Sequence, residues 1–288
     1  MTILESILNK NGREQIYDYI SKKELEKFSD SIYKGYINLI KKGNYLSKLE
    51  WQIRHFLSGK KVALSLLFYT QSVELKERNM KNLSYYSYYY SLFNALLSNI
   101  ILLPYLPYEK VLRISHTEVF KNIENYFVKK NIYSEKELKL LSDLKLAREL
   151  YSYKLPLYGK IFEERNFEEE LKESLEKILK VSNLLSFLSE KAWIKKGINI
   201  EDNYNEHSQK ADELFFLAIE ERDYLGKRLI IDDYDYINLG KISKINPIPL
   251  ECFIEGWLLE DFECAWDEFM DEGYEIESIR KMLDIIKF

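Results

Sequence analysis

Hydrophobic residues recur every three or four positions over most of the first 200 residues, and polar or charged residues fill many of the positions between them. Side chains at this spacing lie on one face of an α-helix. The clearest stripes are Leu25, Phe28, Ile32, Tyr36 and Leu39; Leu138, Leu141, Leu144 and Ala147; and Phe167, Leu171, Leu175, Ile178, Val181 and Leu185. The pattern predicts amphipathic helices that bury these stripes against one another in a bundle.

Four helix starts are marked by a serine that is followed three residues later by a glutamate. In this capping box the hydroxyl accepts a hydrogen bond from a free amide of the first turn, and the carboxylate reaches back to a second amide. The pairs are Ser21 and Glu24, Ser47 and Glu50, Ser115 and Glu118, and Ser134 and Glu137. We therefore predict that helices begin near residues 21, 47, 115 and 134.

One predicted helix has no polar face. Residues 83–103 carry no charge and are apolar or aromatic on nearly every side. Such a helix has to be covered all round, so we expect it at the centre of the bundle, with the helix that opens near Ser47 packed against it. We expect it to end at Leu103, because the ring of Pro104 disfavours helical backbone at the preceding residue.

The domain organisation follows from a change of pattern after Gly197. We expect an all-α protein with a helical bundle over residues 1–197 and a smaller, acidic, mostly helical domain or extension over 198–288. β-branched and aromatic residues around Gly240 are compatible with a short hairpin in the second part. Only 10 Gly and 5 Pro interrupt the whole chain, which favours long helices over sheets.

Charge is distributed unevenly along the chain. Residues 34–81 hold 10 Lys and Arg against 3 Asp and Glu, whereas residues 251–288 hold 3 against 12. A basic segment of this kind fits either a polyanion-binding face, since each neutralised phosphate releases counterions, or an ordinary solvated surface. The candidate nucleic-acid-binding residues are Lys41, Lys42, Arg54, Lys60, Lys61, Arg78 and Lys81.

The acidic C-terminal stretch combines carboxylates with large apolar side chains. Trp257, Trp266 and Phe269 are expected on the apolar side of an amphipathic helix that docks on the core or on a partner protein. The carboxylates do not have the spacing of a calcium-binding loop, and no histidine accompanies them. We therefore predict a partner-binding surface here and no metal site.

Several classes of protein are disfavoured by what the sequence lacks. It contains no glycine-rich phosphate loop, no Gly-x-Ser-x-Gly elbow and no His-Glu-x-x-His motif, and only 2 cysteines. The first residues do not resemble a leader peptide, and the longest apolar runs are too short to span a membrane. We expect a cytoplasmic protein without membrane contact and without a cofactor.

Three short motifs occur in an order that resembles the HEPN domains, which are small helical bundles of prokaryotes and higher eukaryotes. The first is the string Tyr-Tyr-Ser-Leu-Phe-Asn-Ala over residues 89–95, and the second is Ser115-His116 at a helix start. The third is Leu144 and Arg148, followed by Tyr151 or Tyr153. The resemblance covers about residues 45–155.

The resemblance implies a bundle of four or five helices that often dimerises and is frequent in toxin–antitoxin and antiviral systems. Many HEPN proteins cut RNA with an Arg-x(4–6)-His motif, in which the basic pair engages phosphate and supports attack by the ribose 2′-hydroxyl. None of His55, His116 and His207 has that spacing from an arginine, and Asn94 stands where the tyrosine string usually has histidine. The resemblance thus favours a non-catalytic or atypical module that binds RNA or a partner protein, with a role in bacterial defence or a toxin–antitoxin system.

Two other functions stay open at the level of sequence. One is a metal-independent ribonuclease toxin that uses Arg148 and His116. As an alternative, His116 is a cap or surface residue, and Arg148 could equally pair with a carboxylate. The other is a pure interaction scaffold whose acidic tail grips a basic partner or covers the chain's own basic face. A homodimer or a protein partner is expected in either case.

Overall fold

The fold is known from a computed structural model that describes residues 3–8, 13–42, 45–107, 110–111, 113–151 and 165–195. Regular structure in these residues is helical throughout, and no strand occurs among them, which confirms the predicted all-α fold. The elements are α1 (Ile3–Leu8), η1 (Arg13–Asp18), α2 (Lys22–Lys42), α3 (Tyr45–Glu77), α4 (Lys81–Ile101), α6 (His116–Tyr126), η2 (Val128–Lys130), α7 (Glu135–Glu149) and α8 (Phe167–Lys195).

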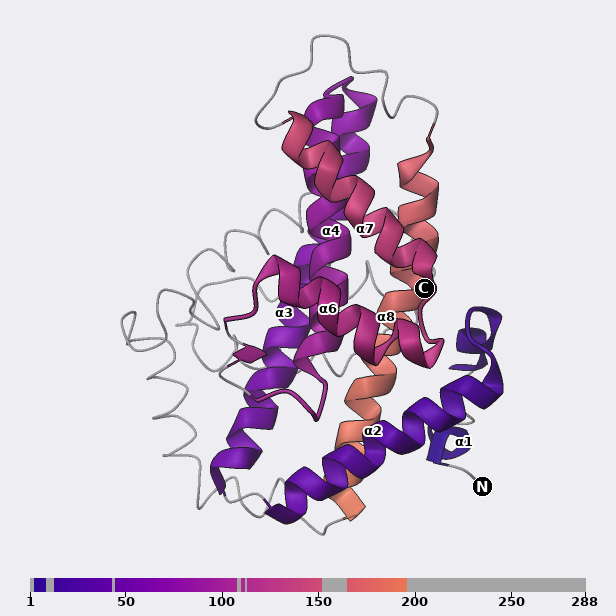
Figure 1. Ribbon diagram of the computed structural model, residues 1–288, viewed down its shortest axis with the longest axis vertical. Helices are drawn as coiled ribbons and strands as arrows, with labels where there is room; N and C mark the ends of the chain where they lie inside the picture. Colours follow the sequence, from indigo (N-terminus) through magenta and orange to yellow (C-terminus); the bar gives the residue numbers. More distant parts are fainter. Residues whose placement is uncertain are drawn as a thin grey trace, which may run out of the picture.

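Helix α4 is the central element of the bundle. It packs along α3 and also contacts α8, α7 and α6 (Figure 1). Every residue from Ser91 to Ile101 is buried, as expected for an uncharged helix that is covered all round. The helix ends at Ile101, two residues before the predicted end at Leu103, and Leu103 and Pro104 are also buried.

The hydrophobic core extends beyond the segment that resembles HEPN domains. Helix α8 packs against both α4 and α2, and α2 crosses the lower part of α8 in Figure 1. Buried apolar residues that belong to one cluster run from Leu4 to Ala192. The two flanking helices are therefore part of the same bundle, and residues 45–155 do not form a separate core.

The predicted capping boxes explain where three helices begin. Ser115 and Ser134 precede α6 and α7, and in both cases the serine and the glutamate satisfy each other's backbone amides. The Ser21 hydroxyl caps α2 in a related way, because it accepts a hydrogen bond from the Glu24 amide. Ser47, in contrast, lies inside α3, which already starts at Tyr45. The predicted helix starts near residues 21, 115 and 134 are confirmed, and the one near residue 47 is two residues late.

Arg54 corrects one part of the predicted basic face. Its side chain is 1% exposed and lies inside the bundle. The guanidinium donates hydrogen bonds to the carbonyl oxygens of Ile101 (3.0 Å), Leu103 (3.3 Å) and Leu106 (2.5 Å). These carbonyls follow the end of α4, where a helix leaves its last acceptors without partners. Arg54 thus serves as an internal cap for α4 and does not belong to a surface.

Several sequence predictions lie outside the described residues. They include the boundary at residue 197, the acidic part over 198–288, the hairpin near Gly240, and the partner-binding residues Trp257, Trp266 and Phe269. Among the helices that the structure does describe, none combines the length and the hydrophobicity that a membrane crossing requires.

Candidate functional site

The two residues predicted as catalytic candidates meet at one side chain. His116 is the first residue of α6 and Arg148 lies in the last turn of α7, and both contact Tyr89 of the central helix α4. The Tyr89 hydroxyl lies 2.5 Å from His116 Nδ1. The guanidinium carbon of Arg148 lies 4.7 Å from the centre of the Tyr89 ring, within the range of a cation–π contact. We call Tyr89, Tyr90, His116 and Arg148 the Tyr89 cluster.

Arg148 is held on the aromatic surface of α4 with part of its hydrogen-bonding capacity unused. Its Nη1 donates to the Tyr90 hydroxyl at 3.2 Å, and its Nη2 donates to Glu149 Oε1 at 3.3 Å. The side chain is only 15% exposed. The Nε atom is buried and has no hydrogen-bond partner among the described residues. Such an unsatisfied buried donor carries a desolvation cost.

His116 is stacked and oriented by its neighbours. Its ring lies 4.3 Å from the Phe93 ring, at an angle of 20°, and nearly parallel to Tyr89 at 5.9 Å. The Ser115 capping box fixes the backbone from which the histidine extends. The imidazole therefore has one defined position against α4.

The Tyr89 phenol is protonated where it contacts His116. Burial raises the pKa of the Tyr89 phenol well above its usual value of about 10, although the nearby Arg148 cation opposes this shift. The phenol accordingly keeps its proton near neutral pH and can donate it to His116 Nδ1. Either atom of this contact can be the donor, depending on the tautomer of His116.

The other tyrosines of α4 point in several directions, as a continuous run on a helix requires. Tyr85 stacks on Tyr151 at 5.0 Å with an interplanar angle of 2°. Tyr88 is buried, and its hydroxyl donates to Glu168 on α8 at 3.5 Å. Only Tyr86 is strongly exposed, at 42%, and its ring lies 4.6 Å from that of Tyr90. The exposed edge of the Tyr89 cluster is thus formed by Tyr86 and Tyr90.

Asn94, which belongs to the tyrosine string of α4, is held by its own helix. Its side chain is buried, and its Nδ2 donates to the Tyr90 carbonyl of the same helix at 2.7 Å. That bond stabilises α4 locally and leaves the amide nitrogen committed to the backbone.

The predicted nucleic-acid-binding residues do not gather on one face. Lys41 and Lys42 end α2 just before α3, whereas Arg78 and Lys81 flank the turn after α3. A helix of 33 residues separates the two pairs, a length of about 50 Å. Lys60 lies midway and is 8% exposed, and its neighbour Lys61 is half-buried. The seven positions are therefore spread along the bundle.

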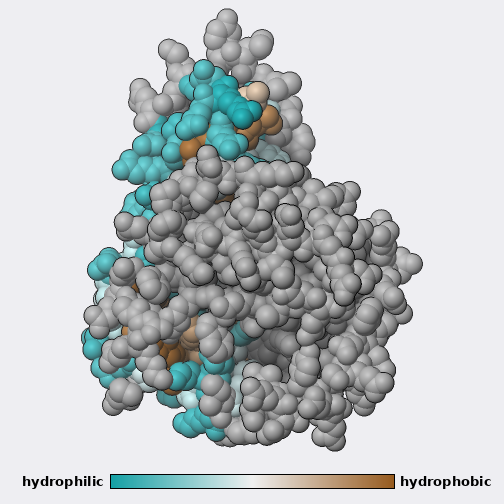
Figure 2. Space-filling model, turned by 180° about the vertical axis from the view of Figure 1, so that it is seen from behind, coloured by the Kyte–Doolittle hydropathy of each residue, from teal (hydrophilic) through white to brown (hydrophobic). Residues whose placement is uncertain are grey.

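Of the predicted nucleic-acid-binding residues, those at the turn between α3 and α4 are exposed. Arg78 and Lys81 are exposed there, together with the apolar side chains of Met80 and Leu83. The corresponding end of the molecule, at the top of Figure 2, is largely hydrophilic with a small hydrophobic area. Two cations at a turn do not by themselves define a polyanion site.

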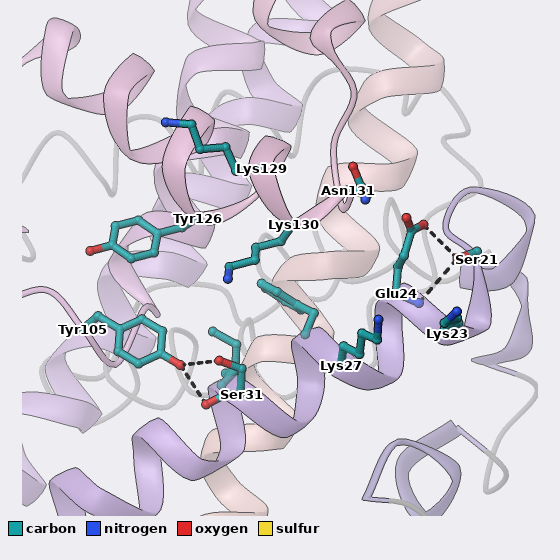
Figure 3. A pocket seen from close by; sticks show the side chains of 12 residues that line it. Ser21, Lys23, Glu24, Lys27, Ser31, Tyr105, Tyr126, Lys129, Lys130 and Asn131 are labelled. Carbon is teal, nitrogen blue, oxygen red and sulfur yellow. Dashed lines mark hydrogen bonds between the residues drawn. The ribbon is translucent and has the colours of Figure 1, made fainter.

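A second candidate site, a cavity lined by lysines, was not predicted from the sequence. A cavity of about 430 Å³ lies between the start of α2 and the end of α6 with η2, and four lysines line it: Lys23, Lys27, Lys129 and Lys130 (Figure 3). The two lysine pairs are about 100 residues apart in the sequence, and lysines on a helix surface are ordinary. Only the packing of α2 beside η2 brings them together.

No group of three potential metal ligands occurs among the described residues, so the structure offers no metal site in that part of the chain.

Comparisons with known proteins add no assignment, because neither a family model nor a curated protein or solved structure matches this chain. By its fold the described part is an all-α helical bundle. Its function has to be argued from the Tyr89 cluster and the lysine-lined cavity.

Proposed function

We propose that this chain is an HEPN-like module that binds single-stranded RNA and does not cut it. The observation that carries the proposal is the position of Arg148, whose guanidinium lies over the rings of Tyr89 and Tyr90. Arginine donors bind phosphate oxygens, and exposed aromatic rings such as Tyr86 stack on unpaired bases. Arg148 supplies the phosphate contact and Tyr86, next to Tyr90, supplies the stacking contact.

The geometry of His116 supports binding over cleavage. Attack by a ribose 2′-hydroxyl requires a group that accepts its proton. In the Tyr89 cluster the Tyr89 hydroxyl lies 2.5 Å from His116 Nδ1, so this ring nitrogen is already engaged in a hydrogen bond. One of the two nitrogens of His116 is thus unavailable to a ribose hydroxyl, which favours binding over cleavage.

The test is a titration of single-stranded RNA of mixed sequence, followed by fluorescence anisotropy. We expect Arg148→Ala to weaken binding about tenfold, because one charge-assisted contact and one stacking surface are lost. Lys139→Ala is the matched control, since it removes an exposed cation from the same helix, and should change the affinity less than about twofold. Absence of binding by the wild-type protein, or equal affinity of the two variants, would contradict the proposal.

A ribonuclease is the second candidate function, because a cation and an imidazole from different helices contact the same tyrosine. It predicts cleavage of an RNA pool in the absence of added metal. Both Arg148→Ala and His116→Ala should then abolish cleavage, whereas Lys139→Ala should not. Cleavage with this pattern would replace the binding proposal, and intact RNA with all proteins would exclude the ribonuclease.

The broader expectations from the resemblance stay predictions. They concern dimerisation, a protein partner and a role in bacterial defence or a toxin–antitoxin system. The hypothesis of an interaction scaffold depends on Trp257, Trp266 and Phe269, which lie outside the described residues.

A further inference from the structure

The lysine-lined cavity is built from two separate elements that face each other. Lys23 and Lys27 lie one turn apart on α2, and Lys130 belongs to η2 on the opposite side. In Figure 3 the side chains of Lys27 and Lys130 extend into the space between these elements. Phe28 and Ile32 line the same cavity from α2 and give it apolar walls.

Positive charge predominates among the described residues that line this cavity. Lys23, Lys27 and Lys130 are exposed and form no ion pair within the part of the chain that the structure describes. Lys129 is different, because it forms an ion pair with Glu124 at 3.4 Å and points away from the cavity (Figure 3). Three exposed ammonium groups that line one cavity give it a positive potential, which attracts an anion.

The carboxylate that lines the cavity does not neutralise these lysines. It belongs to Glu24, whose Oε2 accepts a hydrogen bond from the Ser21 hydroxyl at 2.8 Å as part of the cap of α2. Even with this one negative charge included, the cavity keeps an excess of positive charge.

The aromatic wall is held in place before any ligand arrives. The Tyr105 hydroxyl donates to the carbonyl of Ser31 at 2.7 Å and also lies 3.0 Å from its hydroxyl. The Tyr105 ring, which is 41% exposed, stacks on Tyr126 at 5.9 Å with an angle of 14°. A planar wall that is already ordered costs little entropy when a ligand contacts it.

From this arrangement we infer that the cavity binds a polyphosphate group, either as inorganic polyphosphate or as part of a nucleoside polyphosphate. Lysine ammonium groups bind phosphate oxygens as point charges, and cations on two facing elements suit a chain of phosphates better than a single one. The volume of about 430 Å³ is in the range of small-ligand sites. The cavity residues do not include the Tyr89 cluster, so this inference does not depend on the proposed RNA binding.

The test is calorimetric titration of the full-length protein with tripolyphosphate and with ATP, without added metal and at physiological ionic strength. Lys27→Ala combined with Lys130→Ala should weaken the binding of both ligands at least tenfold, since two charge-assisted contacts are lost. The matched control combines Lys34→Ala on α2 with Lys121→Ala on α6, which removes two exposed charges outside the cavity. This control should bind within about twofold of the wild type.

A comparison of the two ligands identifies the source of the polyphosphate. If ATP binds more tightly than tripolyphosphate and Tyr105→Ala abolishes the difference, the ligand is a nucleotide whose base contacts the aromatic wall. If the two bind equally well, the ligand is inorganic polyphosphate. No binding of either, binding that the cavity variant and the control lose equally, or orthophosphate binding as tight as that of tripolyphosphate would overturn the inference. An RNA-binding defect in Arg148→Ala has no bearing on this outcome, so the two proposals fail separately.

Discussion

At the scale of single residues, two polar side chains inside the bundle hold the end of α4 in place. Arg54 and Tyr36 both bind carbonyl oxygens near the end of α4, and the Tyr36 hydroxyl donates to Leu102 at 2.5 Å. Gly35 lets the loop after α4 approach α2, because a Cβ atom there would lie 2.7 Å from Pro104. These contacts fix the segment that carries Tyr105, and with it one wall of the lysine-lined cavity.

Arg54→Met is expected to lower the free energy of unfolding by about 3 kcal/mol, because buried carbonyls at the end of α4 lose their donor. Arg78→Met serves as the control, since Arg78 is exposed at the α3–α4 turn and should cost less than about 0.5 kcal/mol. Urea unfolding followed by circular dichroism measures both. Equal stability of the two variants would show that Arg54 is not an internal cap.

At the scale of helices, Glu137 joins two elements. Its Oε2 accepts the Ser134 amide at 2.7 Å in the capping box of α7, and its Oε1 accepts Lys177 Nζ of α8 at 2.9 Å. Burial alone would raise the pKa of this carboxyl, but the hydrogen bonds from Ser134 and Lys177 outweigh it and hold the pKa below its usual range. The carboxylate form is thus the one that stabilises the folded bundle.

The lowered pKa of Glu137 makes the stability of the folded bundle depend on pH. A carboxyl whose pKa is lowered by folding stabilises the protein above its unfolded pKa, and this stabilisation is lost as the pH falls through the folded pKa. We expect Glu137→Gln to lower the free energy of unfolding by about 2 kcal/mol at pH 7, and by clearly less at pH 3. Urea titrations at the two pH values measure the difference.

The control for this prediction is Glu135→Gln, which changes an exposed carboxyl in the first turn of the same helix. Its cost should stay small at both pH values, because it gives up only a surface charge near the helix N-terminus. A Glu137 effect that does not depend on pH would indicate that the side chain acts by packing and not by its charge.

At the scale of the whole molecule, the chain combines basic surfaces in its first part with an acidic segment over residues 251–288. The acidic residues of 251–288 lie outside the described part, so the idea that they cover a basic surface stays a hypothesis from sequence. The structure adds a specific basic surface to consider, the lysine-lined cavity with Lys23, Lys27 and Lys130.

If the acidic part masks a basic surface, neutralising it in the full-length chain should strengthen polyanion binding. The substitutions are Glu260→Gln, Asp261→Asn, Asp267→Asn and Glu268→Gln, which change the formal net charge from −5 to −1. We expect the affinity for single-stranded RNA to rise several-fold, with a steeper dependence on salt. The control neutralises four exposed acids elsewhere, namely Asp18, Asp30, Glu77 and Glu135. An equal rise in both proteins would reflect net charge alone and would refute masking by the acidic part.

Much of the helical architecture was predictable because it depends on local interactions. The period of the apolar stripes, the serine–glutamate boxes and the uncharged stretch over 83–103 act within a few residues of sequence. They correctly indicated the helices, the starts of α2, α6 and α7, and the central place of α4.

The sites were predictable only in part. Arg148 and His116 were singled out by residue type and motif order, but their common contact with Tyr89 depends on how α6 and α7 pack on α4. Arg54 was misassigned because its surroundings, the carbonyls after α4, are about 50 residues away in the sequence. An arginine on an amphipathic helix gives no local indication of whether it faces water or a helix end.

The sequence by itself determined that the described residues up to 195 form helices with buried stripes, because helix formation and capping are decided by neighbours along the chain. The tertiary structure alone decided which polar groups meet: Arg54 with the end of α4, His116 and Arg148 at Tyr89, and the lysines of α2 with those of η2. The physical reason is that burial and charge pairing depend on distances in space, and residues far apart in the chain come close only when the helices pack.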